Sequence, residues 1–138
     1  MTDDCVFCGI VAGRLDASLV HEDERTLAFM DLNPITPGHL LVVPRAHAGC
    51  LAELDPGDGA EVFKVAHRLA AAVRSSGVRS DGVNLFLADG EAAGQEVGHV
   101  HLHVVPRYAD DGFTLTADFG SPTRAELDDL AASIRRTL

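Results

Sequence analysis

Three histidines alternate with apolar residues in the run HVHLHVV, which covers residues 99–105. Successive side chains of a β-strand point to opposite faces, so we expect His99, His101 and His103 to share one face while the apolar residues pack behind it. A single histidine in an apolar strand is commonly a satisfied core residue. Three polar rings facing a closed core would each need a hydrogen-bond partner. The run therefore predicts a functional site.

Two kinds of site fit such a row. Alternate strand residues lie about 6.6 Å apart, so His99 and His103 are about 13 Å apart at the backbone. A zinc ion binds each nitrogen at about 2 Å, so the outer two imidazoles of a straight strand cannot both reach one ion. At least one imidazole is then free for another role. The alternative is nucleophilic catalysis, because imidazole is partly neutral near neutral pH and its N–H groups suit a phosphate under attack.

The apolar pattern around this run predicts a series of strands with one long helix inserted and one helix at the end. That order favours an α+β fold with an antiparallel sheet of about five strands. Turn residues and periodicity place the strands at 19–21, 26–30, 39–43, 82–87 and 99–105, and the helices at 59–76 and 124–137.

The helix ends carry recognisable signals. Asp58 with Glu61 resembles a capping box, and we expect Gly77 to end the first helix in a left-handed conformation. Thr123 with Glu126 is a second capping box. The second helix has an apolar face formed by Leu127, Leu130, Ile134 and Leu138.

The chain has 138 residues, 46% of them apolar, which predicts one folded domain over residues 1–138. Its formal charge of −10 opposes nucleic acid and anionic lipid surfaces. The acidic start MTDD has no secretory character, and no apolar stretch approaches the roughly 18 residues of a membrane span. We therefore expect a cytoplasmic protein without a disulfide framework, although it has three cysteines.

The run at 99–105 resembles the His-φ-His-φ-His-φ-φ signature of the histidine triad (HIT) superfamily of nucleotide hydrolases and transferases, where φ is an apolar residue. The resemblance extends from Cys5 to Arg107. Other segments that match in order and spacing are Phe29-Met30-Asp31, Pro37-Gly38-His39, Val43-Pro44 with His47, and Gly94-Gln95. It implies the HIT fold and a homodimer.

The resemblance also implies roles for the reacting groups. His101 would be the nucleophile that forms a covalent nucleotidyl intermediate, from which water releases a nucleoside monophosphate. His103 would help to hold the phosphate, and His39 would fix ring orientation and charge. The implied substrates are adenosine 5'-phosphoramidate, dinucleoside polyphosphates or related AMP conjugates.

Further residues would bind the nucleotide. Asp31 matches the acid that accepts hydrogen bonds from the ribose hydroxyls, although an aspartate before a turn also has a local role as a turn initiator. Gln95, Glu96 and Val97 would contact phosphate oxygens through backbone N–H groups and the Gln95 amide.

Two departures from the family pattern concern the leaving group. The adenosine phosphoramidase branch has serine where this chain has Glu96, and relatives often have an amide side chain at the position of Ala88. These departures leave open a non-catalytic nucleotide-binding module of the same fold. A second alternative is a zinc-dependent hydrolase in which the histidine row holds a catalytic ion.

The cysteine pair in CVFCG, residues 5–9, is by itself ambiguous between zinc ligands, a redox pair and incidental thiols. If strands 39–43 and 99–105 pair antiparallel, His47 and His99 meet at one edge of the sheet. Some bacterial relatives resemble this arrangement and bind a structural zinc through two cysteines and two histidines. We therefore predict zinc at Cys5, Cys8, His47 and His99, with Cys50 unliganded.

Overall fold

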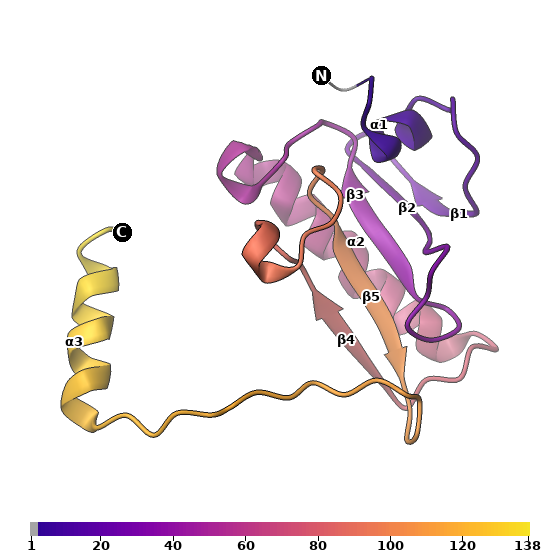
Figure 1. Ribbon diagram of the computed structural model, residues 1–138. Helices are drawn as coiled ribbons and strands as arrows, with labels where there is room; N and C mark the ends of the chain where they lie inside the picture. Colours follow the sequence, from indigo (N-terminus) through magenta and orange to yellow (C-terminus); the bar gives the residue numbers. More distant parts are fainter. Residues whose placement is uncertain (1–2) are drawn as a thin grey trace.

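The computed structural model describes residues 3–138. Met1 and Thr2, which belong to the predicted domain 1–138 and to its acidic start, lie outside that range. Five antiparallel strands form one sheet in the order β1-β2-β3-β5-β4 (Figure 1). The strands are β1 (Leu19–Glu22), β2 (Thr26–Met30), β3 (Leu40–Pro44), β4 (Gly82–Phe86) and β5 (Leu102–Arg107). The α+β prediction is confirmed.

Each face of the sheet carries its own apolar cluster. Helix α2 (Pro56–Ser75) covers one face, and its buried residues pack against side chains such as Val42 and Val104. On the other face, the short helix α1 (Val6–Val11) brings Phe7 against Phe29 and Leu41. The sequence analysis did not predict α1. Because α1 lies on the face opposite α2, it forms a wall above the sheet.

The row of histidines begins before β5 and not within it. The predicted strand 99–105 is Leu102–Arg107, so its start is wrong by three residues. Its neighbour β3 ends at Pro44, and the segment before Leu102 has only an irregular partner, through the bond from Val100 N–H to the Ala48 carbonyl at 2.8 Å. This irregular backbone frees His99 and His101 from the strict alternation of a strand.

Pro106 lies inside β5, whereas the predicted strand ended at residue 105. Its carbonyl accepts a hydrogen bond from the Thr36 hydroxyl at 2.6 Å, so the backbone of Pro106 faces a loop. The pairing of β3 with β5 already ends at Leu40 opposite Val104. The missing N–H of proline therefore costs no ladder hydrogen bond here.

Helix α2 starts and ends differently from the prediction. Asp55 is the N-cap and accepts hydrogen bonds from Gly57 N–H and Asp58 N–H, because Pro56 favours the first helical position. The Asp58 carboxylate instead accepts a bond from Arg25 Nε at 2.7 Å. The helix ends at Ser75, and its C-cap, Ser76, has an extended backbone. The predicted left-handed end at Gly77 is therefore wrong.

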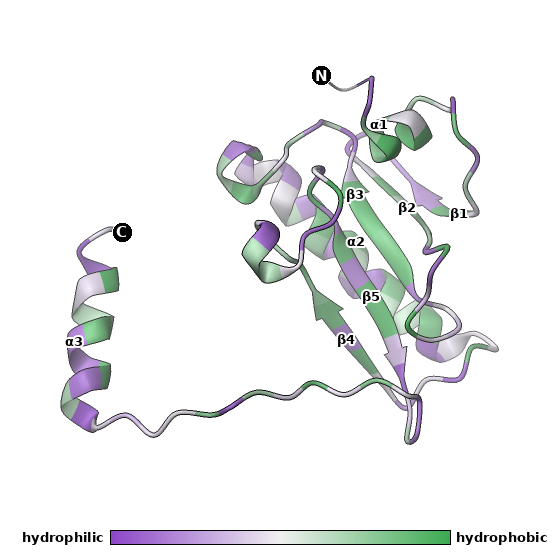
Figure 2. Ribbon diagram, viewed as in Figure 1, coloured by the Kyte–Doolittle hydropathy of each residue, from purple (hydrophilic) through white to green (hydrophobic). Residues whose placement is uncertain are grey.

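Helix α3 (Arg124–Arg135) has the predicted capping box of Thr123 and Glu126. It stands away from the sheet at the end of a long extended segment (Figure 1). Its apolar residues form a stripe along the helix (Figure 2), but none of its side chains is buried among residues 3–138. None of the described helices is long and apolar enough to cross a membrane.

Candidate functional site

A cavity of about 470 Å³ lies on the α1 side of the sheet, opposite α2. Its apolar wall includes Phe7, Phe29, Leu41 and Phe86. The polar side chains that line it include three of the histidines and three carboxylates, namely His39, His101, His103, Asp16, Asp31 and Glu96. The cavity thus joins an apolar surface, suited to a flat ring, to a group of imidazoles.

His101 is buried, with 6% of its surface exposed, and lines this cavity. Its Nδ1 lies 2.7 Å from the His99 carbonyl oxygen. A carbonyl only accepts, so Nδ1 carries the proton and the neutral ring keeps its lone pair on Nε2. The ring of Phe7 packs edge-on against it, with 5.1 Å between centroids. Position 101 therefore holds an oriented imidazole with one basic nitrogen unused by the backbone.

His103 and His39 are linked in a directed chain of hydrogen bonds. The N–H of Ile35 donates to His39 Nδ1 at 2.9 Å, so the proton of neutral His39 is on Nε2. That nitrogen lies 2.9 Å from His103 Nδ1, which accepts. The remaining nitrogen of His103, Nε2, then carries a proton and is a donor. These partners assign His103 as a hydrogen-bond donor within the cavity wall.

Burial keeps this pair uncharged. Burial, followed by the neighbouring His101 and His39, lowers the pKa of His103 from 6.5 to about 4. Burial also lowers the pKa of His39, and the nearby Asp31 carboxylate opposes this shift. The ring of His103 stacks on Phe86, with 4.2 Å between centroids. Both imidazoles are thus neutral near pH 7, in agreement with the proton assignment above.

The backbone before His39 is built for a close approach. Gly38 has a φ of 95°, and a Cβ there would lie 2.6 Å from a Val78 methyl group. Only glycine fits both conditions. The turn at Gly38 therefore fixes the position of His39 next to His103.

Asp31 lines the cavity directly after β2 and also has the predicted local role in a turn. One carboxylate oxygen accepts a hydrogen bond from Asn33 N–H at 2.8 Å. The other lies 3.5 Å from His39 Nε2. The turn-initiating role and a position on the cavity are therefore compatible in one side chain.

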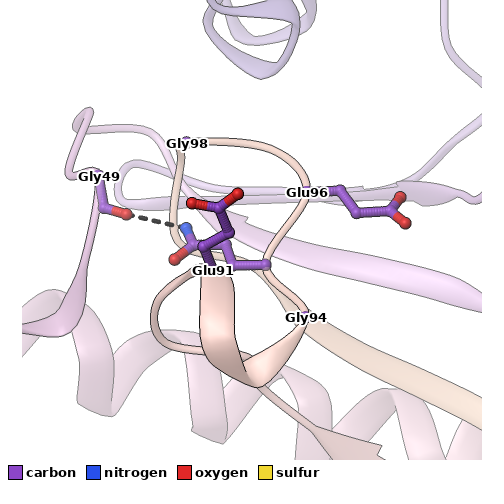
Figure 3. Close-up of a pocket in the computed structure, with 6 residues that line it drawn as sticks. Gly49, Glu91, Gly94, Glu96 and Gly98 are labelled. Atoms are coloured by element: carbon purple, nitrogen blue, oxygen red, sulfur yellow. Dashed lines mark hydrogen bonds between the residues drawn. The ribbon is translucent and has the colours of Figure 1, made fainter.

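The side chain of Gln95 lies in the loop and not in the cavity of His101. Its amide nitrogen donates to Gly49 O at 2.8 Å and to Val97 O at 3.0 Å, and its oxygen accepts from Gly90 N–H. Figure 3 shows the bond to Gly49 in a second, open hollow of about 620 Å³. The Gln95 amide therefore fixes the loop that carries Glu96 and Val97, both of which do line the cavity.

Cys5, Cys8, His47 and His99 converge at the other end of the histidine row, and these four residues could hold a metal ion. The Nδ1 of His99 lies 3.5 Å from both sulfurs, and the Nδ1 of His47 lies 3.2 Å from the Cys8 sulfur. His99 is fully buried, and its Nε2 donates to the Pro44 carbonyl at 2.8 Å. Its Nδ1 lone pair is therefore directed at the sulfurs.

The donor set fits a tetrahedral ion. Zinc bonds of about 2.3 Å to sulfur and 2.0 Å to nitrogen imply a sulfur–nitrogen separation of about 3.5 Å at tetrahedral angles. Burial, with the hydrogen bond and charge of Cys5, raises the pKa of the Cys8 thiol to about 11. Such a thiol resists ionisation unless a cation holds the thiolate. Cys50 is not in this cluster.

Asp31, His39 and His103 form a second group with metal-like spacing. The directed hydrogen bonds argue against an ion there. His39 Nδ1 is occupied by Ile35 N–H, and a proton lies between His39 Nε2 and His103 Nδ1. A metal would have to displace that proton and leave the chain of donors broken. The group therefore fits a proton arrangement better than a metal.

Sequence reasoning missed the aromatic residues of the site. Phe7 packs against the rings of both His99 and His101, and Phe86 stacks on His103. Phe7 lies between the two cysteines, and its place inside that C-x-x-C segment was the available signal. His21, which pairs with Asp23, and the exposed His67 lie outside both clusters.

Comparisons with known proteins agree with this geometry. A family model described as the HIT domain matches residues 12–110. A crystal structure of a HIT family member from Bacillus subtilis has 34% identity and a TM-score of 0.91, covering 98% of this chain and 97% of that one. A Zn-bound histidine triad protein from Mycobacterium smegmatis has 39% identity over 96% of this chain and 99% of its own, with a TM-score of 0.79. An adenylylsulfatase from Arabidopsis thaliana is 38% identical over 80% of this chain and 56% of its own length.

Proposed function

The chain belongs to the HIT domain family, a fold of nucleotide-binding hydrolases and transferases, and we propose that His101 attacks the α-phosphorus of AMP conjugates. The substrate would be adenosine 5'-phosphoramidate, a dinucleoside polyphosphate or a related AMP ester. The observation that carries the proposal is the bond from His101 Nδ1–H to the His99 carbonyl at 2.7 Å, because it leaves Nε2 as the basic atom.

The reaction has two steps. His101 Nε2 forms a bond to the α-phosphorus while the bond from phosphorus to the leaving group breaks, and the leaving group takes up one proton. In the second step, the hydroxyl of a water molecule bonds to phosphorus while the bond between phosphorus and His101 Nε2 breaks. The proton that this water releases replaces the one taken up by the leaving group. A nucleoside monophosphate is released and His101 returns to its neutral form.

The remaining residues would hold the nucleotide and stabilise charge. His103 Nε2–H would donate to a phosphate oxygen, and His39 would keep His103 in that tautomer. Asp31 would accept from the ribose hydroxyls, and backbone N–H groups at Glu96 and Val97 would contact the phosphate. For Gln95 we propose a positioning role in that loop, because its amide is fully engaged there.

The metal that we propose for Cys5, Cys8, His47 and His99 is a structural zinc. Two thiolates and two imidazoles would close its tetrahedron and leave no position for substrate. When bound, it would cross-link the N-terminal segment to the loop after β3, which carries His47, and to the segment before β5, which carries His99. His101, two residues after His99, does not belong to this cluster and keeps Nε2 for the reaction.

We also propose that the protein is a homodimer, and cytoplasmic localisation stays a prediction. The Ala88 and Glu96 departures support one alternative, a nucleotide-binding module without turnover. Glu96 places a carboxylate at the cavity that we propose for the phosphate, and the two negative charges would repel each other.

A substrate panel tests the proposal. Adenosine phosphoramidate, dinucleoside polyphosphates and aminoacyl adenylates are offered to the wild type and to His101→Ala, with metal content measured alongside. Turnover of at least one substrate by the wild type, absent in the variant, supports the hydrolase. Tight nucleotide binding without turnover favours the module. Activity that disappears with the metal while the fold persists would instead indicate a catalytic ion.

A further inference from the structure

Helix α1 carries residues of both clusters on one short segment. Cys5 is its N-cap and Cys8 lies in its first turn, and both sulfurs belong to the group that could hold a metal ion. Three apolar side chains of α1 line the cavity of His101, namely Val6, Phe7 and Ile10. A shift of α1 therefore changes the metal cluster and the cavity together.

The position of α1 on the sheet depends on side chains. Within residues 3–138, its backbone hydrogen bonds all stay between residues 5 and 15. Its polar contacts with the sheet side are those of the cysteine sulfurs, which lie 3.2 to 3.5 Å from ring nitrogens of His47 and His99. A helix of six residues is too short to be stable alone in water. The sulfurs and the apolar packing around Phe7 therefore fix its place.

Phe7 connects these two attachments. Its side chain is buried, with 6% of its surface exposed. The ring packs edge-on against His99, with 6.0 Å between centroids, and against His101, with 5.1 Å. It also packs against Phe29 on β2 at 5.4 Å. One aromatic ring thus contacts an imidazole of the metal cluster and the imidazole at the cavity, and such edge-on contacts depend on how the rings are oriented.

A metal ion and a nucleotide would select the same position of α1. The sulfur–nitrogen separations already suit a tetrahedral ion, so a bound ion holds α1 where the structure places it. A flat base at the apolar end of the cavity would bury surface against Phe7 and favour that position as well. Because both ligands order one helix, each lowers the ordering cost that the other must meet.

We propose that Phe7 is a positioning residue through which metal binding at the cysteine–histidine cluster and nucleotide binding in the cavity strengthen each other. The inference rests on the proposed function for its nucleotide and on the proposed zinc for its ion, and it adds an effect of metal occupancy on nucleotide affinity. By thermodynamic reciprocity, each ligand tightens the other by the same factor. The tautomer of His101 is set separately, by the His99 carbonyl.

Zinc affinity of the full chain tests the coupling without any turnover. It is measured by equilibrium competition with a coloured chelator, first alone and then with AMP at a concentration that calorimetric titration shows to be saturating. We expect AMP to tighten zinc binding by about fivefold or more. Ribose 5-phosphate, which has no base to contact Phe7, should have a smaller effect. Zinc affinity that bound AMP leaves unchanged would overturn the coupling alone, whereas a failure of AMP to bind would contradict the proposed function itself.

Matched phenylalanine variants show whether Phe7 carries the coupling. Phe7→Ala keeps all four metal ligands, so it should still bind zinc, but AMP should no longer change its zinc affinity. Phe7→Leu, the milder variant, should give a factor between those of Phe7→Ala and the wild type. Phe63→Ala, on the outer face of α2 and 57% exposed, is the control and should keep the wild-type factor. A wild-type factor in both Phe7 variants would mean that AMP acts through folding as a whole, and would overturn the proposal.

Discussion

The two clusters of imidazoles in this protein present the same residue type in opposite tautomers. At one end of the row, His99 donates Nε2–H to the Pro44 carbonyl and directs the lone pair of Nδ1 at two cysteine sulfurs. Two residues later, His101 donates Nδ1–H to the His99 carbonyl and leaves Nε2 unbonded at a cavity. The difference lies in which nitrogen a backbone carbonyl occupies, and that choice fits one ring for a metal and the other for a nucleophile.

The contrast also directs the free nitrogens of His99 and His101 to different places. The irregular backbone before β5 lets His99 and His101 turn toward different surroundings, which a regular strand would not allow. The two clusters are linked through His99, because its backbone carbonyl accepts the hydrogen bond from His101 Nδ1–H. A change at the metal cluster should therefore affect stability first, and a change at the cavity should affect turnover first.

The largest expected effect is on turnover, from His101→Ala. Loss of the attacking nitrogen should lower kcat by about 10⁴-fold or more, since the covalent path is removed. Thermal unfolding checks that the variant stays folded, because the buried ring also packs against Phe7. Steady-state kinetics with the best substrate of the panel measures the loss. His67→Ala, an exposed histidine on α2, is the control and should keep full activity.

The second prediction concerns the metal cluster and uses Cys8→Ser. Loss of one thiolate should remove the bound zinc and lower the free energy of unfolding by about 3 kcal/mol or more. Cys50→Ser, outside the cluster, should keep both zinc and stability. Metal analysis and urea unfolding measure these quantities. If the folded Cys8→Ser protein lost turnover as completely as His101→Ala, the separation of the two clusters would be wrong.

How far sequence reasoning reaches is visible in these same residues. The alternating histidines and the C-x-x-C spacing, together with the resemblance to the HIT family, predicted both clusters, because antiparallel pairing brings the end of one strand to the start of the next. The sequence did not reveal the tautomers, since these depend on the carbonyls of Pro44 and His99. It also did not reveal α1, whose six residues are too few for a clear helical period.

The errors at the helix and strand ends have local physical causes. Pro56 at the first helical position makes Asp55 the N-cap of α2, and the Ser76 hydroxyl, which donates to the Val73 carbonyl, caps the helix before Gly77. For α3 the amphipathic pattern was read correctly, but a pattern does not say which surface the apolar face meets. The role of Gln95 depended on long-range bonds to Gly49 that spacing alone could not indicate.

A third, smaller effect should follow from His39→Ala, which tests positioning within the cavity cluster. Without the Nε2–H donor, His103 Nδ1 loses its partner and the imidazole can adopt the other tautomer. We expect kcat to fall by about 10- to 100-fold with a smaller change in KM. Nitrogen-15 NMR of the His103 ring should show the altered tautomer. An unchanged His103 spectrum together with unchanged kcat would rule out this positioning role.

The smallest expected effect is the pH dependence of stability. The pKa of His103 is about 4 in the folded protein and 6.5 as the ordinary value. Between these values the unfolded chain binds more protons, so the free energy of unfolding falls as the pH falls from 6.5 toward 4. Solvent screening limits the contribution of His103 to the order of 1 kcal/mol. Urea unfolding of His103→Asn should show a shallower decline than the wild type. A decline as steep as that of the wild type would contradict the neutral assignment.

The most direct test of the central claim is the mass of the protein during turnover. A reaction with an adenylate donor is quenched within milliseconds, and the intact protein and its peptides are weighed. The account predicts one nucleotidyl group on the His101 ring, absent in His101→Ala and still present after Cys8→Ser as long as that variant is folded. Turnover without any adduct, or an adduct on another residue, would contradict it.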